Sequence, residues 1–170
     1  MKPGHAPAGP RLSTMLTRPH QLVALVFGIG TLPVWPGTVG TVAGFALFAA
    51  LQPLPALPRA AVYIALLVLG SWAILRTGED LGAPDHNGIV FDETIAMSLV
   101  LEFVAPGAVE WIAAFALFRL FDVWKPWPIR LVHRTGQGGF MVILDDLLAG
   151  LYAVVVMRLA VMPALAWLAG

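Results

Sequence analysis

The stretch FMVILDDLLAGLYAVVV, residues 140–156, is an apolar run that contains two adjacent aspartates, Asp145 and Asp146. Neither aspartate has a lysine or an arginine within ten residues on either side. Burying a bare carboxylate is costly, and two neighbouring carboxylates repel each other. The run therefore predicts a helix whose two acids need a partner from elsewhere in the chain.

The composition of the 170-residue chain is unusual for a soluble domain. Hydrophobic residues make up 59% and charged residues 12%, against about 25% charged residues in a typical soluble domain. The mean hydropathy is +0.83, and so small a chain has too little interior to hide that much apolar surface. Lipid is the simplest solvent for it. The zero formal net charge argues against nucleic-acid binding, and the absence of cysteine excludes thiolate chemistry.

The order of apolar segments predicts an all-α, membrane-embedded bundle of about five helices with short, motif-bearing loops. We expect one membrane domain over residues 21–170, after a polar, basic and flexible segment over residues 1–20. The expected helices are 39–51, 59–75, 89–104, 108–121 and 140–161, the last ending before Pro163. The third and fourth are short for a full span, so they span partly, lie in the interface or pack inside the bundle. A wholly soluble helical bundle stays open as the alternative.

Polar segments separate these helices. GIGTLPVWPGTVGT (28–41) is expected to be a loop or re-entrant turn, 76–88 a polar loop and 130–139 a Gly-rich basic loop. If the N-terminus is cytoplasmic and each helix crosses, the basic residues of the loops and N-terminal segment lie inside: Lys2, Arg11, Arg18, Arg76, Lys125, Arg130 and Arg134. This is the positive-inside pattern, and it brings every polar motif to the cytoplasmic side.

Acidic residues open the expected third helix. The stretch EDLGAPDHNGIVFDETIAM (79–97) includes Asp85 and places Asp92 and Glu93 at the start of an apolar run. Acids at a helix N-terminus can simply favour the helix dipole. Facing Asp145 and Asp146 across a bundle, however, they would form a carboxylate metal site. Hard oxygen ligands without cysteine suit Mg²⁺ or Mn²⁺.

Without a metal, the aspartate pair could be tolerated in two ways, and both stay open: one aspartate is neutral, or the pair contacts Arg119 or Arg158. A further charged cluster lies in FRLFDVWKPWPIRLVHR (118–134), where Arg119, Asp122 and Lys125 are three residues apart on one helix face. These three can form plain ion pairs, with Trp124 and Trp127 as interfacial anchors. Alternatively, three of the cationic residues of the stretch, Lys125, Arg130 and Arg134, hold a phosphate.

Glycines in the 28–41 segment could also meet a phosphate. Backbone N–H groups near Gly37, Thr38, Gly40 and Thr41 could cradle it, although the segment lacks the lysine of a P-loop. His20, His86 and His133 are isolated in the sequence, so surface or supporting roles are expected for them.

Four stretches together resemble one known family. PGTVGT (36–41), DHNGIVFDE (85–93), FRLFDVWKPWPIR (118–130) and GGFMVILDDLLAG (138–150) occur in the order found in the phosphatidylglycerophosphatase A family of bacterial membrane phosphatases. The resemblance covers residues from about 20 to 157. Ala96 and Ser98 stand where that family usually has a glycine and an aromatic residue, which puts fine substrate fit in question more than the reaction.

The resemblance implies Mg²⁺-dependent removal of the terminal phosphate from phosphatidylglycerophosphate, giving phosphatidylglycerol, in phospholipid biosynthesis. It implies a multi-pass protein of the bacterial inner membrane whose active site faces the cytoplasm. Its partners are then the lipid substrate and membrane lipids; the oligomeric state is left open. The polar core that it implies is Asp85, Asp92, Glu93, Asp122, Lys125, Arg130, Asp145 and Asp146.

In the resulting hypothesis, the two acidic pairs hold Mg²⁺ while Lys125 and Arg130 stabilise the phosphoryl charge. Asp122 or Asp85 orients the attacking water as general base. A covalent aspartyl-phosphate stays open, although no DxDxT motif is present. The alternatives are a phosphatase for another lipid phosphate or a soluble ester, and a small transporter subunit with an acidic ion path.

Overall fold

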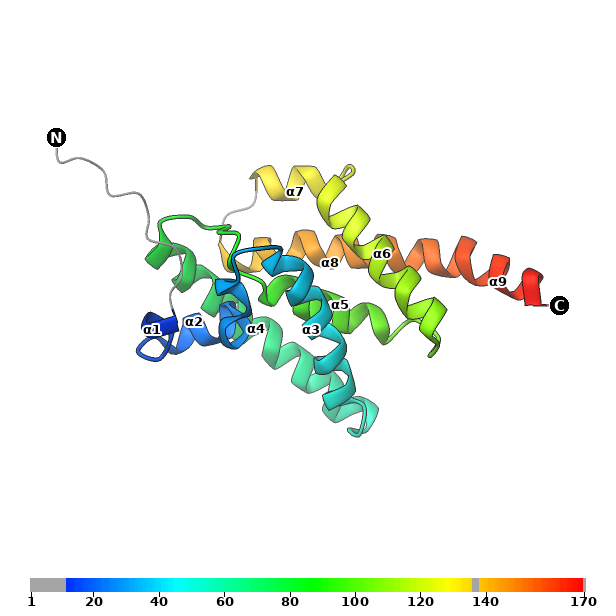
Figure 1. Cartoon of the computed structure of the whole chain (residues 1–170), viewed down its shortest axis with the longest axis horizontal. Helices are drawn as coiled ribbons and strands as arrows, with labels where there is room; N and C mark the ends of the chain where they lie inside the picture. The colour runs from blue at the N-terminus through cyan, green and yellow to red at the C-terminus, as the bar shows by residue number, and fades with distance from the viewer. Residues whose placement is uncertain (1–11, 136–137, 170) are drawn as a thin grey trace.

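The computed structural model describes residues 12–135 and 138–169, and the described parts are helical and connected by short loops (Figure 1). The elements are α1 (Leu12–Met15), α2 (Pro19–Ala24), the 3₁₀ segment η1 (Val26–Thr31), α3 (Pro36–Leu51), α4 (Ala56–Leu81), α5 (Phe91–Leu101), α6 (Ala108–Trp124), α7 (Ile129–Thr135), α8 (Gly139–Val156), the π segment η2 (Met157–Val161) and α9 (Met162–Ala169). The all-α prediction is confirmed, and the five expected helices correspond to α3, α4, α5, α6 and α8.

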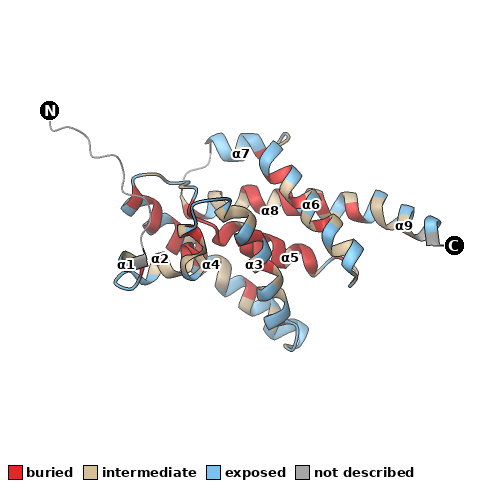
Figure 2. Ribbon diagram, in the orientation of Figure 1, coloured by how far each residue is buried: buried red, intermediate tan, exposed pale blue. Residues whose placement is uncertain are grey.

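The short helix α5 occupies the centre of the molecule, packed between α3 and α8, with α4 and α6 also against α8 (Figures 1 and 2). All of its residues except Glu93 and Leu99 are buried. Eleven residues span about 16 Å, roughly half of a bilayer core. Of the options for this segment, packing inside the bundle is the one that the structure shows.

Close approach of α3 to α5 depends on glycines. A Cβ atom on Gly44 would lie 2.7 Å from the Thr94 carbonyl oxygen and 2.8 Å from Met97 Cβ. One turn earlier, the Thr94 hydroxyl donates a hydrogen bond of 2.8 Å to the carbonyl of Gly40. The stretch 36–41 is therefore the first part of a helix and not a loop as predicted, because Pro36 is favoured at a helix start and the glycines serve packing.

Three other predicted boundaries were wrong. Helix α4 continues through Arg76 to Leu81 and ends at Gly82, whose φ of 68° suits glycine. The basic loop predicted over 130–139 is helical as α7 up to Thr135; residues 136–137 lie outside the described residues. The last helix does not end before Pro163, because the wide π turns of η2 precede the proline and relieve its clash with the previous turn.

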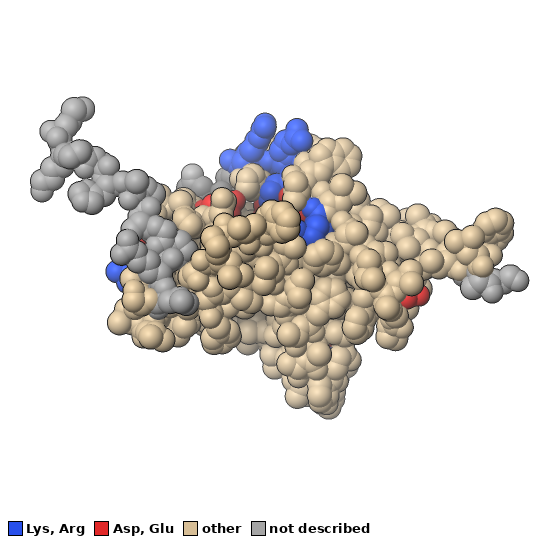
Figure 3. Space-filling model, viewed as in Figure 1, with Lys and Arg blue, Asp and Glu red and all other residues tan. Residues whose placement is uncertain are grey.

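Two helices are long and apolar enough to cross a membrane, Ala56–Leu81 and Gly139–Leu165. By itself this finding is weak support for membrane association, since core helices of soluble proteins pass the same test. Figure 3 adds that charged side chains gather along one edge, above a broad uncharged surface over α3 and α4. Of the N-terminal segment, residues 1–11 lie outside the described residues, while 12–20 contribute α1 and the start of α2.

Candidate functional site

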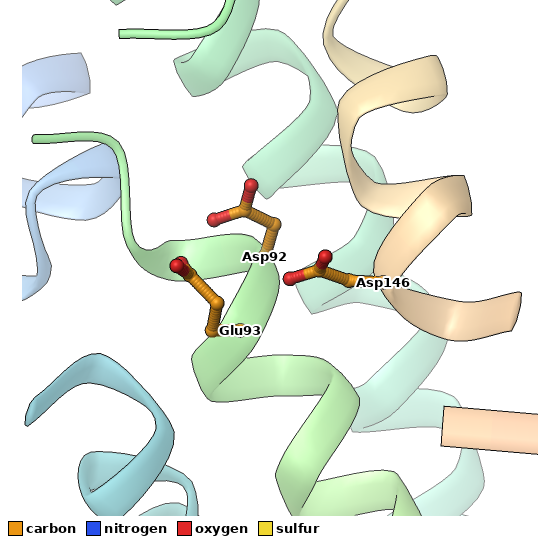
Figure 4. A group of neighbouring side chains, drawn as sticks. All are labelled: Asp92, Glu93 and Asp146. Carbon is orange, nitrogen blue, oxygen red and sulfur yellow. The ribbon is translucent and has the colours of Figure 1, made fainter. Parts of the chain in front are cut away.

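Three carboxylates meet where the first turn of α5 faces α8. Asp92, Glu93 and Asp146 each offer one oxygen, and these oxygens all lie within 4.8 Å of one another. Figure 4 shows Asp92 and Glu93 side by side on the first turn of α5, with Asp146 reaching toward them from α8. Successive residues of a helix point about 100° apart, so Asp92 and Glu93 can both contribute an oxygen to one group with Asp146. This group could hold a metal ion.

The burial of these acids supports that interpretation. One oxygen each of Asp92, Glu93 and Asp146 is buried without a hydrogen-bond partner among the described residues. Burial raises the pKa of Glu93 to about 7. Burial, with the charges of Glu93 and Asp146, also raises the pKa of Asp92 well above its usual range. Unpartnered buried carboxylate oxygens fit a hard divalent cation, which would offset their repulsion.

Asp145 is separated from this group. Its carboxylate accepts hydrogen bonds from Lys125 Nζ at 2.5 Å and from the His133 ring at 2.9 Å. The neighbouring residue Asp146 faces α5, so the two aspartates of the opening stretch have different partners. The predicted ion pairs of these aspartates with Arg119 or Arg158 do not form. Arg119 pairs with Asp122, Arg158 donates to the Phe103 carbonyl, and Asp145 pairs with Lys125.

Two cations lie next to the three acids: Arg119 on α6, and Lys125 directly after the last residue of that helix. Arg119 Nη1 lies 2.6 Å from Asp122 Oδ2 and 3.8 Å from Glu93 Oε1, and Lys125 Nζ lies 3.6 Å from Asp122 Oδ1. Burial alone would lower the pKa of Lys125, but the hydrogen bond to Asp145 and the surrounding carboxylates outweigh it and raise that pKa. The ion pairs inferred from the spacing do form, and they form beside the three acids.

A cleft of about 440 Å³ joins these groups. Its lining residues are Pro33, Trp35, Pro36, Gly37, Thr38, Asp85, Asn87, Ile89, Asp92, Glu93, Arg119, Asp122, Lys125, Asp145 and Asp146. They come from the start of α3 and the residues just before it, the first turn of α5, the N-terminal half of α8, the C-terminal part of α6 with Lys125, and the loop after α4. The predicted acids, Lys125, Gly37 and Thr38 are thus brought together.

Four other predicted site residues do not line the cleft. Gly40 packs on Val90, and the buried Thr41 hydroxyl donates to the Gly37 carbonyl at 2.9 Å. Arg130 and Arg134 are exposed on α7, where Arg130 donates to the Trp124 carbonyl at 3.5 Å. Gly40 and Thr41 therefore pack behind the residues of α3 that line the cleft, and do not line it themselves.

Sequence reasoning gave too little weight to several residues. Arg119 was considered only as an ion-pair partner, although its spacing from Asp122 already placed it on the same helix face as Lys125. His133 has no sequence signal for its contact with Asp145, because that contact depends on how α7 folds back on α8. Another isolated histidine, His20, lies 2.7 Å from Asp80 and ties α2 to the end of α4, which is a structural role.

Comparison with known proteins decides the family. The sequence profile described as phosphatidylglycerophosphatase A matches residues 22–161. The chain belongs to the phosphatidylglycerophosphatase A family. The resemblance drawn from its motifs is confirmed, and the chain is an enzyme of the phosphatase class. No solved structure matches it.

Three relatives show the range of the similarity. The chain is 36% identical over 136 residues to phosphatidylglycerophosphatase A of Escherichia coli strain K12, covering 79% of each chain. It is 40% identical over 143 residues to that of Haemophilus influenzae, covering 83% of this chain and 88% of the relative. It is 34% identical over 157 residues to a protein of Bacteroides thetaiotaomicron named putative phosphatidylinositol-3-phosphatase, covering 85% and 97%.

Proposed function

We propose that this phosphatase hydrolyses phosphatidylglycerophosphate to phosphatidylglycerol and phosphate with the help of Mg²⁺, as a step of phospholipid biosynthesis. The observation that carries the proposal is the cleft itself, which sets the acids Asp92, Glu93 and Asp146 beside the cations Arg119 and Lys125. A metal-binding acidic group next to two cations is what a phosphate monoester requires. The family and its two relatives of that name support this choice of substrate.

The donor set fits the metal. Asp92, Glu93 and Asp146 would hold Mg²⁺, or Mn²⁺, through their unpartnered oxygens. When bound, the ion supplies charge stabilisation for the phosphoryl group and a lower pKa for a coordinated water. Asp145, predicted as a fourth ligand, has the role of fixing Lys125 in this scheme, because its carboxylate already accepts hydrogen bonds from Lys125 and His133.

The protein's own side chains bind and orient the substrate. Lys125 and Arg119 donate to the phosphoryl oxygens from a cleft wall where Asp122 keeps both cations in place. Because the oxygens of Asp122 are engaged by these two cations, they are poorly placed to accept a proton. Asp85, half-exposed in the cleft and 3.7 Å from His133, is better placed to take a proton from the attacking water.

Arg130 and Arg134 belong outside the reacting centre in this proposal. Both are exposed on α7, and α7 lies at the edge of the molecule where charged side chains gather (Figures 1 and 3). From there they would meet the phosphodiester of the substrate or anionic lipid headgroups. The positive-inside pattern supports a cytoplasmic location of this edge in the inner membrane, with α4 and α8 as spanning helices.

A phosphate-release assay in detergent tests the proposal. Purified protein should release phosphate from phosphatidylglycerophosphate with Mg²⁺ and lose the activity in EDTA. Asp92→Asn should lower kcat at least about 100-fold by removing a metal ligand. Glu79→Gln, which alters an exposed acid paired with Arg76 at the same end, is the matched control and should retain activity. Full activity of Asp92→Asn would remove the proposed metal site.

A second candidate function comes from the relative in Bacteroides thetaiotaomicron, whose name describes a phosphatidylinositol-3-phosphatase. The same cleft could accept another lipid phosphate, since the acids and cations recognise only the phosphate. Comparing kcat/KM for phosphatidylglycerophosphate, phosphatidylinositol 3-phosphate, phosphatidate and a soluble ester distinguishes the candidates. The preferred substrate should exceed the others by at least about tenfold, the effect of one well-placed polar contact.

A further inference from the structure

The cleft has one wall without charge. Pro33, Trp35, Pro36, Gly37 and Thr38 form that wall at the start of α3, whereas the rest of the lining is rich in acids and cations. A site with a charged floor and an uncharged, partly apolar wall is complementary to an amphiphile. The phosphate of such a molecule would occupy the floor, and its apolar part would leave the cleft along this wall.

Trp35 is the largest side chain of that wall. The residue is 76% exposed even though it lines the cleft. Its backbone is left-handed, with φ 51° and ψ 45°, a conformation that is unfavourable for a residue with a Cβ atom. Pro36 at the helix start and the Val39 N–H donating to the Trp35 carbonyl, at 3.2 Å, hold this geometry. The backbone thus places the indole at the cleft mouth.

The segment before Trp35 repeats the same two features. Val26 and Phe27 also have positive φ, and they are two of the four such non-glycine residues in the described part of the chain. Phe27 is 82% exposed, and Leu32 and Val34 are exposed as well. A backbone held in strained conformations that also leaves large apolar side chains exposed has two unfavourable features. An apolar partner for the exposed side chains of Leu32, Val34 and Trp35, which we call the rim, would offset the second of these.

A second apolar surface lies outside the lining of the cleft. A groove of about 260 Å³ lies between α5 and α8, lined among others by Leu99, Leu147 and Leu151. Its lining shares no residue with the lining of the cleft. Of the apolar residues that line the cleft, Trp35 is the large exposed one, so a molecule whose phosphate lies in the cleft can place its apolar part against the indole.

We propose that Trp35 and the rim residues Leu32 and Val34 bind the acyl chains of the substrate next to its glycerol. This contact selects a phosphate monoester attached to a lipid over the same headgroup without chains. The inference rests on the proposed function, because it assigns the apolar part of the molecule whose phosphate that function places among the acids. Trp35 would then be a specificity-determining residue and not a catalytic one.

The test compares variants on two substrates. Wild type, Trp35→Gly and Trp124→Ala are assayed in detergent with dihexanoyl phosphatidylglycerophosphate and with its deacylated headgroup. The headgroup is followed by turnover, or as a competitive inhibitor where its turnover is low. Glycine suits the left-handed backbone at position 35, so the variant removes the indole without adding strain. Trp124 is an exposed tryptophan at the same end of the molecule that does not line the cleft.

Trp35→Gly should lower the ratio of kcat/KM for the acylated over the deacylated substrate about tenfold, the effect of losing one or two buried methylene contacts. Trp124→Ala should leave that ratio within about twofold. An unchanged ratio in Trp35→Gly, or an equal loss on both substrates, overturns the inference while the proposed function stands. If wild type neither hydrolyses the acylated substrate nor binds the headgroup, the proposed function itself fails and this inference with it.

Discussion

At the scale of single residues, the central feature is three carboxylates that are buried together. Asp92, Glu93 and Asp146 each keep one buried oxygen without a hydrogen-bond partner among the described residues. Their mutual repulsion destabilises the fold unless a proton or a cation offsets it. The same repulsion is what gives a divalent cation its affinity, so stability and metal binding should be linked at these residues.

That linkage gives a prediction for Asp146→Asn. In wild type, Mg²⁺ at about 100 times its Kd should stabilise the protein by about 2.7 kcal/mol. For a chain of this size, each kcal/mol raises Tm by about 2–4 °C, so the shift should be about 5–10 °C. Asp146→Asn should raise the Tm of the metal-free protein, because it removes repulsion, and should abolish the Mg²⁺ shift. Melting in detergent with Mg²⁺ or EDTA measures both.

Asp145→Asn provides the contrast to that variant. Because Asp145 contacts Lys125 and His133 and not the three-acid group, its variant should retain most of the Mg²⁺ shift. A complete loss of the shift in Asp145→Asn would contradict its assignment as the partner of Lys125. It would restore the four-ligand site that the sequence predicted.

The ion pair of Lys125 and Asp145 leads to a second prediction. Lys125→Met leaves a buried carboxylate with His133 as its remaining partner, which should cost about 3 kcal/mol of stability. It should also lower kcat at least about 100-fold by removing a phosphate-binding charge. The double variant Lys125→Met/Asp145→Asn should recover most of the stability and none of the activity. Denaturation and phosphate release, measured on the same preparations, separate the two roles.

Most of the candidate site could be predicted from the sequence at this scale. Asp92, Glu93 and Asp146 were identified because acids inside apolar runs need a reason to be there. The partner of Asp145 could not be predicted, since Lys125 precedes it by 20 residues and reaches it only through the packing of α6 on α8. The position of Trp35 in the cleft could not be predicted either. It depends on a left-handed backbone at a residue type for which that conformation is unusual.

At the scale of helices, α5 organises the molecule. It is short and almost wholly buried, so its first turn can present Asp92 and Glu93 inside the bundle. The glycines of α3 let that helix approach α5 closely, which positions the uncharged wall of the cleft above the acids. Packing between these two helices and the geometry of the cleft are therefore coupled.

Gly44→Ala tests this coupling. Helix propensity alone would make alanine better than glycine by about 1 kcal/mol in α3. The new Cβ would instead meet the Thr94 carbonyl and Met97, so we expect a net loss of about 1–3 kcal/mol and reduced activity. Ala46→Gly, at an exposed position of the same helix, should show the ordinary propensity cost of about 1 kcal/mol and keep activity. A more stable Gly44→Ala would contradict the close packing.

The presence of the long helices was easier to predict from the sequence than the residues at which they begin and end. Long apolar segments identified α3, α4, α5, α6 and α8, because burial of apolar side chains decides that helices form there. The helix ends depend on single residues and local turns that the composition of a segment does not show. Pro36 begins a helix where Gly and Pro content indicated a loop, and η2 carries the last helix past Pro163.

At the scale of the whole molecule, helix direction explains why one site can form. The N-terminal ends of α3 and α5, the N-terminal half of α8 and the C-terminal part of α6 all reach the cleft. The turns at 52–55 and 102–107 lie at the opposite ends of these helices. A bundle that alternates in direction collects its motifs at one edge, and Figure 3 shows the charged side chains gathered along such an edge.

This arrangement predicts a definite orientation in the membrane. The chain contains no cysteine, so single cysteines can be introduced without a background. Arg134→Cys on α7 should be protected from a membrane-impermeant thiol reagent in intact spheroplasts and react after lysis, because the basic residues favour the cytoplasmic side. Gln52→Cys, in the exposed turn between α3 and α4, should react from outside in intact spheroplasts. The reverse pattern would place the cleft on the outer face, and reaction of both sites only after lysis would show that α3 and α4 do not carry this turn across the bilayer.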